Sequence, residues 1–325
     1  MHNIAVLGLG SMGLKHAAAA IADGHNVVGY DPSTAALARL CEIGGRPVET
    51  LAAALQACSL VVIASPPAYH LAQAEAAIMA GKSVLVEKPL ADRIGELENL
   101  VQIAEQNRLV FAVAQNLRYH PAVHAAREFI AAGAVGQPIS VVSVGVSHLA
   151  DWRPHQSVRD NYAADSRSGG VIFDWVHEID MLVYLFGPFT PLAAVAERSG
   201  RLDIESEDTA ALVLRHDKSG PLASINLSYL PRPRRRFTEI FGTEGRLELD
   251  LPGRALRRWD AGGDLVEICE FGGKHADDYV AELSAFLVAA DGRGQVRCSA
   301  RDALDVLRGV LALRQMAGLP AAGVA

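Results

Sequence analysis

Short apolar runs alternate with segments of helical spacing over the first 115 residues of the chain. The runs expected to form strands are Ile4–Leu7, Val27–Tyr30, Leu60–Ala64, Ser83–Val86 and Val110–Ala114. The segments expected to form helices are Gly13–Ala22, Ala35–Ile43, Leu71–Ala80 and Ile94–Gln106. Strands that consist of continuous apolar runs are typical of a parallel sheet covered by helices on both faces. This part of the chain therefore predicts a repeated βα unit with right-handed connections.

A different pattern begins after Gln115. One helix is expected at Ala122–Ala132, and a strand runs from near Pro138 to Val146. Further elements are expected as strands at Ala193–Arg198, Thr209–His216, Ala223–Leu230, Phe237–Phe241 and Arg246–Leu251, and as helices at Asp277–Ala290 and Ala300–Met316. Apolar residues alternate with polar neighbours in these strands, which indicates a mainly antiparallel sheet. The sequence predicts an α/β domain at residues 1–118 and an α+β domain at residues 119–325.

Composition excludes several classes of protein. Of the 325 residues, 50% are hydrophobic and 21% are charged, which is ordinary globular usage and excludes disorder. The net charge of −7 predicts no nucleic-acid partner, and the basic run Arg232–Arg236, with its two prolines, predicts an exposed loop. The apolar runs are too short to cross a membrane, and the chain starts without a targeting pattern. Four scattered cysteines fit reduced thiols and a cytoplasmic location.

A glycine motif follows the first expected strand. Residues 8–13 are Gly-Leu-Gly-Ser-Met-Gly, and they open the first expected helix. In such a turn, Gly8 allows the tight bend, Gly10 lets the backbone approach a pyrophosphate, and Gly13 lets the helix pack on the strand. The helix N-terminus offers N–H groups and a partial positive charge to phosphate. The motif in this context predicts a dinucleotide-binding Rossmann domain.

Asp31 ends the second expected strand, 23 residues after Gly8. A carboxylate at this place accepts hydrogen bonds from the ribose hydroxyls and repels a 2′-phosphate. No Arg or Lys follows before Arg39, so the sequence favours NAD over NADP. The alternative is that Asp31 only caps the helix that starts near Ser33. Ser65, Pro66 and Pro67 follow the third strand, where they line the cofactor or only shape the turn.

Glu87-Lys88-Pro89 places a lysine at the carboxyl end of the fourth expected strand. Ligands of open α/β sheets bind in the crevice outside the carboxyl ends of the strands. Pro89 keeps the Lys88 backbone extended. A lone lysine at a strand end is usually a solvated surface residue. The neighbouring motifs make Lys88 a candidate catalytic residue instead.

The segment Val171–Phe186 is apolar nearly throughout and predicts one largely buried helix. Its polar residues Asp174, His177, Glu178 and Asp180 span an arc of roughly 160° at helical spacing. A buried polar stripe must face partners or a wet crevice. Three carboxylates around one histidine raise its basicity and suit it to proton transfer. Two alternatives are a structural His–Asp network that links the domains and a metal site at Asp174, His177 and Asp180, although no further His or Cys stands at ligand spacing.

A long segment without helical or strand pattern, residues 151–169, precedes this helix. It includes Trp152, Arg153 and Tyr162, which can stack on a polar ligand or hydrogen-bond to it. Loops of this length in a compact domain are usually functional or disordered. We expect a substrate wall, with a solvated surface excursion as the alternative. Upstream, His120 and His124 are expected at the surface or lining the crevice.

These motifs together resemble the Gfo/Idh/MocA oxidoreductases, over essentially the whole chain. The residues that show the resemblance are Gly8–Gly13, Glu87-Lys88-Pro89, Asn116–Pro121, Gly169-Gly170 leading to Asp174 and His177, and Gly242–Gly245. The resemblance implies catalysis by Lys88 and by the histidine at His177, and a sugar, polyol or sugar derivative as substrate. Many family members place four steps and a glycine between the aspartate and the histidine, whereas the spacing here is three. This leaves open which carboxylate orients His177.

The predicted function is NAD-dependent hydride transfer to or from a carbinol carbon, with the substrate between the domains over Lys88. The predicted catalytic residues are Lys88, His177 and Asp174, and no metal ligand is predicted. The predicted cofactor-binding residues are Gly8, Gly10, Ser11, Met12, Gly13, Asp31, Ser65, Pro66, Pro67, His70, Glu87, Lys88 and Asn116. The predicted substrate-binding residues are Lys88, Arg118, Trp152, Arg153, Tyr162, Asp174 and His177. Alternatives are an NAD-dependent glycosidase of the same family and a non-catalytic NAD-binding regulator.

The strands of the second domain are apolar on both faces, as at Val141 and Val144. A sheet with helices on one side only should be polar on its open side. We therefore expect a homodimer or homotetramer in which a partner subunit covers the second face. The alternative is that the segments after Asp277 cover both faces within one chain.

Overall fold

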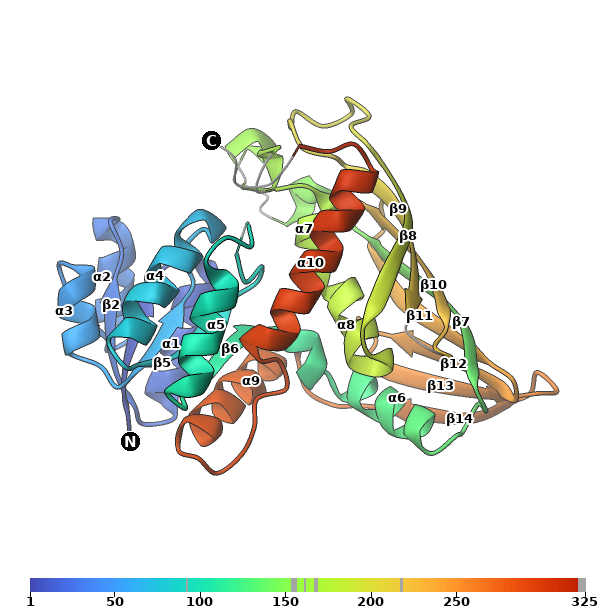
Figure 1. Cartoon of the computed structure of the whole chain (residues 1–325), viewed down its shortest axis with the longest axis horizontal. Helices are drawn as coiled ribbons and strands as arrows, with labels where there is room; N and C mark the ends of the chain where they lie inside the picture. The colour runs from blue at the N-terminus through green and yellow to red at the C-terminus, as the bar shows by residue number, and fades with distance from the viewer. Residues whose placement is uncertain (92, 153–156, 161, 167–168, 217–218, 321–325) are drawn as a thin grey trace. The chain divides into compact units, whose positions relative to one another are not determined.

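The computed structural model describes residues 1–91, 93–152, 157–160, 162–166, 169–216 and 219–320 (Figure 1). The chain forms two compact units. The first unit consists of Met1–Asn116 and His275–Leu304, and the second consists of Leu117–Lys274 and Asp305–Ala325. Each unit is built around one sheet.

The sheet of the first unit has six parallel strands in the order β3-β2-β1-β4-β5-β6. This is the strand order of the dinucleotide-binding fold, and it confirms the predicted α/β Rossmann class. The strands are β1 (Asn3–Leu7), β2 (Asn26–Tyr30), β3 (Arg46–Pro47), β4 (Leu60–Ile63), β5 (Ser83–Glu87) and β6 (Phe111–Ala114). The helices are α1 (Ser11–Ala22), α2 (Thr34–Glu42), α3 (Leu51–Gln56), α4 (Pro67–Met79) and α5 (Leu97–Gln106). The short elements β3 and α3 were not predicted, because two and six residues are too few to show a period.

Helix α9 (His275–Ala290) packs with the first sheet. Its residues Leu283, Phe286 and Leu287 belong to the same buried cluster as Ala112 and Ala114 of β6. The segment after α9 continues this association, since Cys298 O accepts a hydrogen bond from Val113 N at 3.1 Å. The predicted boundary at 118/119 assigns residues 275–304 to the other domain, and this difference arises because an amphipathic pattern does not specify which core covers it.

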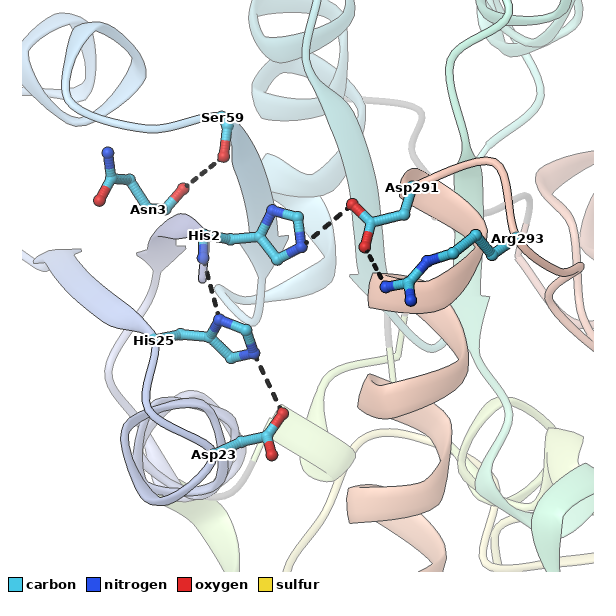
Figure 2. A network of polar contacts seen from close by, with 7 residues as sticks. All are labelled: His2, Asn3, Asp23, His25, Ser59, Asp291 and Arg293. Atoms are coloured by element: carbon cyan, nitrogen blue, oxygen red, sulfur yellow. Dashed lines mark hydrogen bonds and ion pairs between the residues drawn. The ribbon is translucent and has the colours of Figure 1, made fainter.

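A polar network at the amino ends of β1 and β2 joins the end of α9 to this sheet (Figure 2). His2 donates its backbone N–H to His25 Nδ1 at 3.0 Å, and His2 Nε2 lies 3.3 Å from Asp291 Oδ1. His25 Nε2 lies 3.0 Å from Asp23 Oδ2, and Arg293 pairs with the other oxygen of Asp291. The chain of contacts fixes the turn after α9 to the first strand.

The sheet of the second unit has eight strands in the order β14-β13-β12-β11-β7-β10-β9-β8, with β7 and β10 parallel and all other pairs antiparallel. The prediction of a mainly antiparallel sheet is therefore confirmed. The strands are β7 (Pro138–Val146), β8 (Phe189–Glu197), β9 (Thr209–His216), β10 (Leu222–Ser228), β11 (Arg235–Gly242), β12 (Gly245–Asp250), β13 (Ala255–Asp260) and β14 (Leu265–Glu270). The α-helices of this unit are α6 (Pro121–Ala131), α7 (Val171–Asp174), α8 (Val176–Phe186) and α10 (Ala300–Met316), the last beginning in the first unit.

The two faces of the second sheet differ in exposure. Helices α6 and α8 lie on one face of this sheet (Figure 1), and Val141 of β7 and Leu212 of β9 are fully buried. The opposite face holds Val144, Leu222 and Val195, of which Val195 is 70% exposed. Among the described residues of the second unit, no helix lies on this opposite face (Figure 1). An apolar sheet face without a cover is typical of an interaction surface.

Two local predictions were wrong. Arg235 and Arg236 belong to β11 rather than to an exposed loop, and Arg236 is buried because its guanidinium pairs with Glu178. The predicted helix Val171–Phe186 is two helices, α7 and α8, with a break at Trp175. The Trp175 ring packs on Gly145 of β7, where a Cβ would lie 2.5 Å from a ring carbon. An apolar pattern does not reveal a one-residue break of this kind.

Among the residues that the structure describes, no helix combines the length and the hydrophobicity needed to span a membrane.

Candidate active site

The turn between β1 and α1 has the geometry of a pyrophosphate cradle. Gly8 has φ +85°, and a Cβ there would lie 2.4 Å from Ser65 N. A Cβ on Gly13 would lie 1.9 Å from Gly8 O, so neither position accepts a side chain. A Cβ on Gly10 would meet nothing within 4 Å, so this position borders open space where a ligand can approach. Helix α1 begins at Ser11, has no side-chain cap and so presents its N–H groups, including that of Met12, to the same space.

Asp31 lies beside this turn at the end of β2. Its Oδ2 accepts a hydrogen bond from Leu9 N at 2.7 Å, and its Oδ1 accepts one from Ser33 N at 2.8 Å. The N-cap of α2 is Ser33, whose hydroxyl accepts from Ala36 N, so the structure gives the capping role to Ser33. The carboxylate is held against the glycine turn, and its remaining lone pairs suit the hydroxyls of a ribose. The residues present therefore fit NAD.

Lys88 directly follows β5, and the residue before it is anchored. Glu87 Oε1 lies 2.8 Å from Nε2 of His16, which comes from α1. Both side chains are buried. The strand end that presents Lys88 is thus joined to the helix that starts at the glycine turn.

The residue after Lys88 is anchored as well. His70 of α4 contacts Pro89 O through Nδ1 at 2.9 Å and Ser65 O through Nε2 at 2.8 Å. Pro66 and Pro67 start α4 as its N-cap and first residue, and Ser65 lies against Gly8. Asn116 starts the short 3-10 helix Asn116–Tyr119 after β6 and is buried. The structure therefore brings the predicted cofactor residues to one edge of the sheet, at the carboxyl ends of β1, β2, β4, β5 and β6.

In the second unit, the carboxylates of α7 and α8 have separate partners. Asp174 Oδ2 accepts a hydrogen bond from Tyr229 OH at 2.6 Å. Glu178 pairs with Arg236, and Asp180 accepts two hydrogen bonds from Arg118, at 2.8 and 2.9 Å. Each of the three carboxylates thus has a hydrogen-bonding partner of its own, and the expectation that they raise the basicity of His177 stays a prediction. His177 is half-buried, whereas the other residues of 171–182 are buried.

The predicted substrate residues have different environments. Arg118 is buried, with its charge engaged by Asp180 and its guanidinium 5.4 Å from the Tyr184 ring. Trp152 is 37% exposed and donates from Nε1 to Ser147 Oγ at 3.0 Å. Tyr162 lies in the short 3-10 helix Tyr162–Ala164, and Arg153 lies outside the described residues.

His120 was expected at the surface or in the crevice, but it is buried. Its Nδ1 accepts from Ala122 N at 3.2 Å, and its Nε2 donates to Leu251 O at 3.1 Å. It therefore caps α6 and connects it to the sheet.

A buried ion pair that sequence reasoning missed holds the start of α7. Arg314 Nη1 of α10 donates a hydrogen bond to Glu207 Oε1 at 2.9 Å. The same oxygen accepts a hydrogen bond from Ile172 N at 3.2 Å. Gly170 has φ +96°, and a Cβ there would lie 2.2 Å from the Glu207 carboxylate. Burial raises the pKa of the Glu207 carboxyl, and the Arg314 charge counteracts that rise. The Gly169-Gly170 element is thus a close approach between the backbone and a buried carboxylate.

Comparison with known proteins assigns the family. Residues 2–115 match the oxidoreductase family with an NAD-binding Rossmann fold, and residues 123–248 match the GFO/IDH/MocA C-terminal domain. The chain belongs to the Gfo/Idh/MocA oxidoreductases. The predicted resemblance is confirmed, and the first unit carries the NAD-binding domain of the family.

Relatives in this family include several sugar enzymes. The chain is 28% identical to 1,5-anhydro-D-fructose reductase of Ensifer adhaerens, over 74% of this chain and 72% of that protein. It is 27% identical to D-apiose dehydrogenase of Paraburkholderia graminis, over 58% of this chain and 50% of that protein. Several of these matches span about half the length of the curated relative. A solved levoglucosan dehydrogenase in complex with NADH and levoglucosan has the same fold, with a TM-score of 0.87, 22% identity and coverage of 97% of each chain.

Within the described part of this Gfo/Idh/MocA chain, no group of three or more His, Cys, Asp or Glu side chains is placed to hold a metal ion.

The residues that sequence reasoning missed are the partners of the polar residues on and around α7 and α8. Tyr229 continues the alternation of Ile225 and Leu227 toward the covered face, and that position was the available signal. Arg236 and Arg314 gave no signal, because surface arginines and buried ones have the same sequence pattern.

Proposed function

We propose that this chain is an NAD-dependent oxidoreductase that moves hydride between the nicotinamide and a carbinol carbon of a sugar, polyol or sugar derivative. The observation that carries the proposal is the position of Lys88 at the sheet edge that also holds the glycine turn and Asp31. Ligands of such sheets bind at this edge. Membership of an oxidoreductase family supports the same assignment.

We assign the following roles in the oxidative direction. Bound NAD supplies a hydride acceptor. Lys88 donates a hydrogen bond to the substrate oxygen as it gains negative charge, and a preorganised donor of this kind is worth about 3 kcal/mol. His177 accepts the hydroxyl proton on its imidazole. Asp174, fixed by Tyr229, holds the end of α7 next to the His177 helix.

The substrate class rests on the relatives. Enzymes named for D-apiose, 1,5-anhydro-D-fructose and levoglucosan are among them, and all of these compounds carry several hydroxyl or carbonyl oxygens on a small carbon skeleton. Trp152, partly exposed and edge-on to the Tyr229 ring, offers an apolar face for such a skeleton. Trp152 is therefore proposed as part of the substrate wall.

A substrate screen tests this proposal. The full chain is mixed with NAD or NADP and with levoglucosan, 1,5-anhydro-D-glucitol, D-apiose, inositols and aldoses, and the absorbance of the reduced cofactor is followed. Equimolar formation of NADH and ketone or lactone supports the proposal. Glycoside cleavage without net NADH would favour the NAD-dependent glycosidase, and NAD binding without turnover of any compound would favour the regulator.

We further propose a homodimer or homotetramer formed through the uncovered face of the second sheet. The exposed apolar residues Leu192, Val195 and Leu222, together with Val144, support this surface. Light scattering should give a multiple of the chain mass of 34.5 kDa, and Val144→Asp should lower it. A wild-type mass near 34.5 kDa would reject the assembly. The free cysteines fit a reducing compartment such as the cytoplasm.

A further inference from the structure

Two buried histidines contact the residues immediately before and after Lys88. On the side of Glu87, His16 contacts the carboxylate at 2.8 Å. On the side of Pro89, His70 contacts the backbone carbonyl at 2.9 Å. His16 is 2% exposed and His70 is 1% exposed, so water does not compete for either contact. The two histidines come from different helices, α1 and α4, and both of these helices begin at the edge where the dinucleotide site lies.

The contacts of His70 determine how many protons its ring carries. Nδ1 faces Pro89 O and Nε2 faces Ser65 O, and a carbonyl oxygen only accepts hydrogen bonds. A neutral imidazole has one N–H, so it would satisfy one carbonyl and direct a nitrogen lone pair at the other from below 3 Å. Only the imidazolium donates from both nitrogens. Burying a charge is costly unless it is paired and hydrogen-bonded, and here both N–H groups of the imidazolium have a hydrogen-bond acceptor.

We propose that His70 is a buried imidazolium that ties the loop after β4 to the Lys88-Pro89 segment, and that His70 and His16 together are positioning residues for Lys88. The part that concerns catalysis rests on the proposed function. Through His70, the Ser65 backbone that borders Gly8 is fixed relative to Pro89. Through His16, the helix of the glycine turn is fixed relative to Glu87. The lysine backbone is therefore held on both sides by groups that also shape the dinucleotide site.

The physical reason for such a frame is the length of the lysine side chain. Four carbon–carbon bonds separate its ammonium group from the backbone, so a small rotation of the backbone at Lys88 moves the donor through a larger distance. A misplacement of about 1 Å can lower a rate about a hundredfold. Neither histidine needs to touch substrate for this effect.

The proton count is tested without any substrate. The full chain is labelled with ¹⁵N-histidine, and two-bond proton–nitrogen spectra are recorded near neutral pH, with the His70 signals assigned through their loss in His70→Gln. We expect both His70 nitrogens to show the shift of a protonated ring nitrogen. A spectrum with one protonated and one unprotonated nitrogen would overturn the imidazolium.

The positioning role is tested with the best substrate of the screen above. His16→Leu and His70→Leu should lower kcat about 10- to 100-fold, and because both contacts also shape the dinucleotide site, the Kd for NADH, measured by fluorescence, should rise by a smaller factor than kcat falls. His16→Gln supplies an N–H donor to Glu87 and should recover most of kcat, whereas His70→Gln replaces one of the two ring donors and should recover part of it. His275→Gln, an exposed histidine of the same unit, is the matched control and should leave both values unchanged.

The outcomes separate the two proposals. Full activity of Lys88→Met would reject the catalytic lysine itself. An inactive Lys88→Met together with fully active His16→Leu and His70→Leu would reject the frame and leave the proposed function standing. An equal loss of kcat in the Leu and Gln variants of one histidine would also reject its role as a hydrogen-bonding positioner. If the Leu variants fail to fold, the spectra and the Gln variants decide.

Discussion

The two edges of the first sheet both carry histidine networks, yet their surroundings differ. At the amino edge, His2 and Asp291 are 20% and 30% exposed in their side chains, and the network ends in solvent-facing Asp23 and Arg293 (Figure 2). At the carboxyl edge, His16 and His70 are almost fully buried. The first network joins α9 to the sheet, whereas the second contacts the residues on either side of Lys88, at the edge that also holds the open glycine turn.

This difference shows that residue types alone do not identify a functional site. Histidines, carboxylates and an arginine lie together at the amino edge, which is not the edge where parallel sheets bind ligands. At the carboxyl edge, the backbone of Gly8 and Gly13 comes too close to its neighbours for any side chain, while Gly10 borders open space. Because the strands are parallel, the glycine turn and Lys88 both lie at the carboxyl edge of the sheet, where α/β proteins bind ligands. The position of each network relative to the strand direction therefore distinguishes the candidate functional site from the structural network, whereas the residue types do not.

The largest effect should come from removing the lysine at the carboxyl edge. Lys88→Met keeps the length and apolar part of the side chain but removes the donor, so kcat should fall about a hundredfold or more, with NAD affinity nearly unchanged. Steady-state kinetics and NADH fluorescence titration measure the two quantities. Normal turnover of this variant would show that the carboxyl edge does not carry the chemistry through Lys88.

The glycine turn should respond to a single methyl group. In Gly13→Ala, the Cβ would lie 1.9 Å from Gly8 O, so the turn must open and the phosphate-facing N–H groups move apart. We expect NAD affinity to fall about tenfold or more. Gly24→Ala is a control for adding a methyl group, because a Cβ at Gly24 meets nothing within 4 Å, although its φ of +82° adds backbone strain. Equal NAD affinity in Gly13→Ala and the wild type would contradict the cradle.

Asp31 should set the choice of cofactor. Asp31→Ala removes the charge that repels a 2′-phosphate and the acceptors for the ribose hydroxyls, so the ratio of kcat/KM for NAD to that for NADP should fall about tenfold. Steady-state kinetics of the wild type and the variant with each cofactor, on the substrates of the screen, measure this ratio. A wild-type enzyme equally efficient with NADP would already contradict the assignment.

The smallest effect should come from the amino edge. His2→Gln weakens a partly exposed contact with Asp291, and contacts of this kind contribute about 0–1 kcal/mol. Denaturant unfolding should show a decrease in the free energy of unfolding within this range, while kcat and NAD affinity stay within about twofold of the wild type. A loss of activity comparable to that of Lys88→Met would mean that the two edges are not functionally distinct.

Sequence reasoning predicted the elements whose signal is local. The glycine motif, the apolar strands and the lysine before Pro89 are visible because a turn, a buried strand and a strand end each constrain neighbouring residues. The pair of His16 and Glu87 is separated by 71 residues, and only the folded sheet with its helices brings the two side chains together. The same holds for Asp174 with Tyr229. Strand β13, with Arg257, Arg258 and Asp260 among its residues, lacks the apolar alternation that marked the other strands.

Hydrogen exchange measured by mass spectrometry, with and without saturating NAD, tests the central claim that the carboxyl edge is the functional edge. Bound ligand lowers the population of open states where it contacts the protein. The account predicts slower exchange in peptides that cover residues 8–14, 64–70 and 87–90, and unchanged exchange in peptides that cover His25 and Asp291. Protection at the amino edge, or none at residues 8–14, would contradict it.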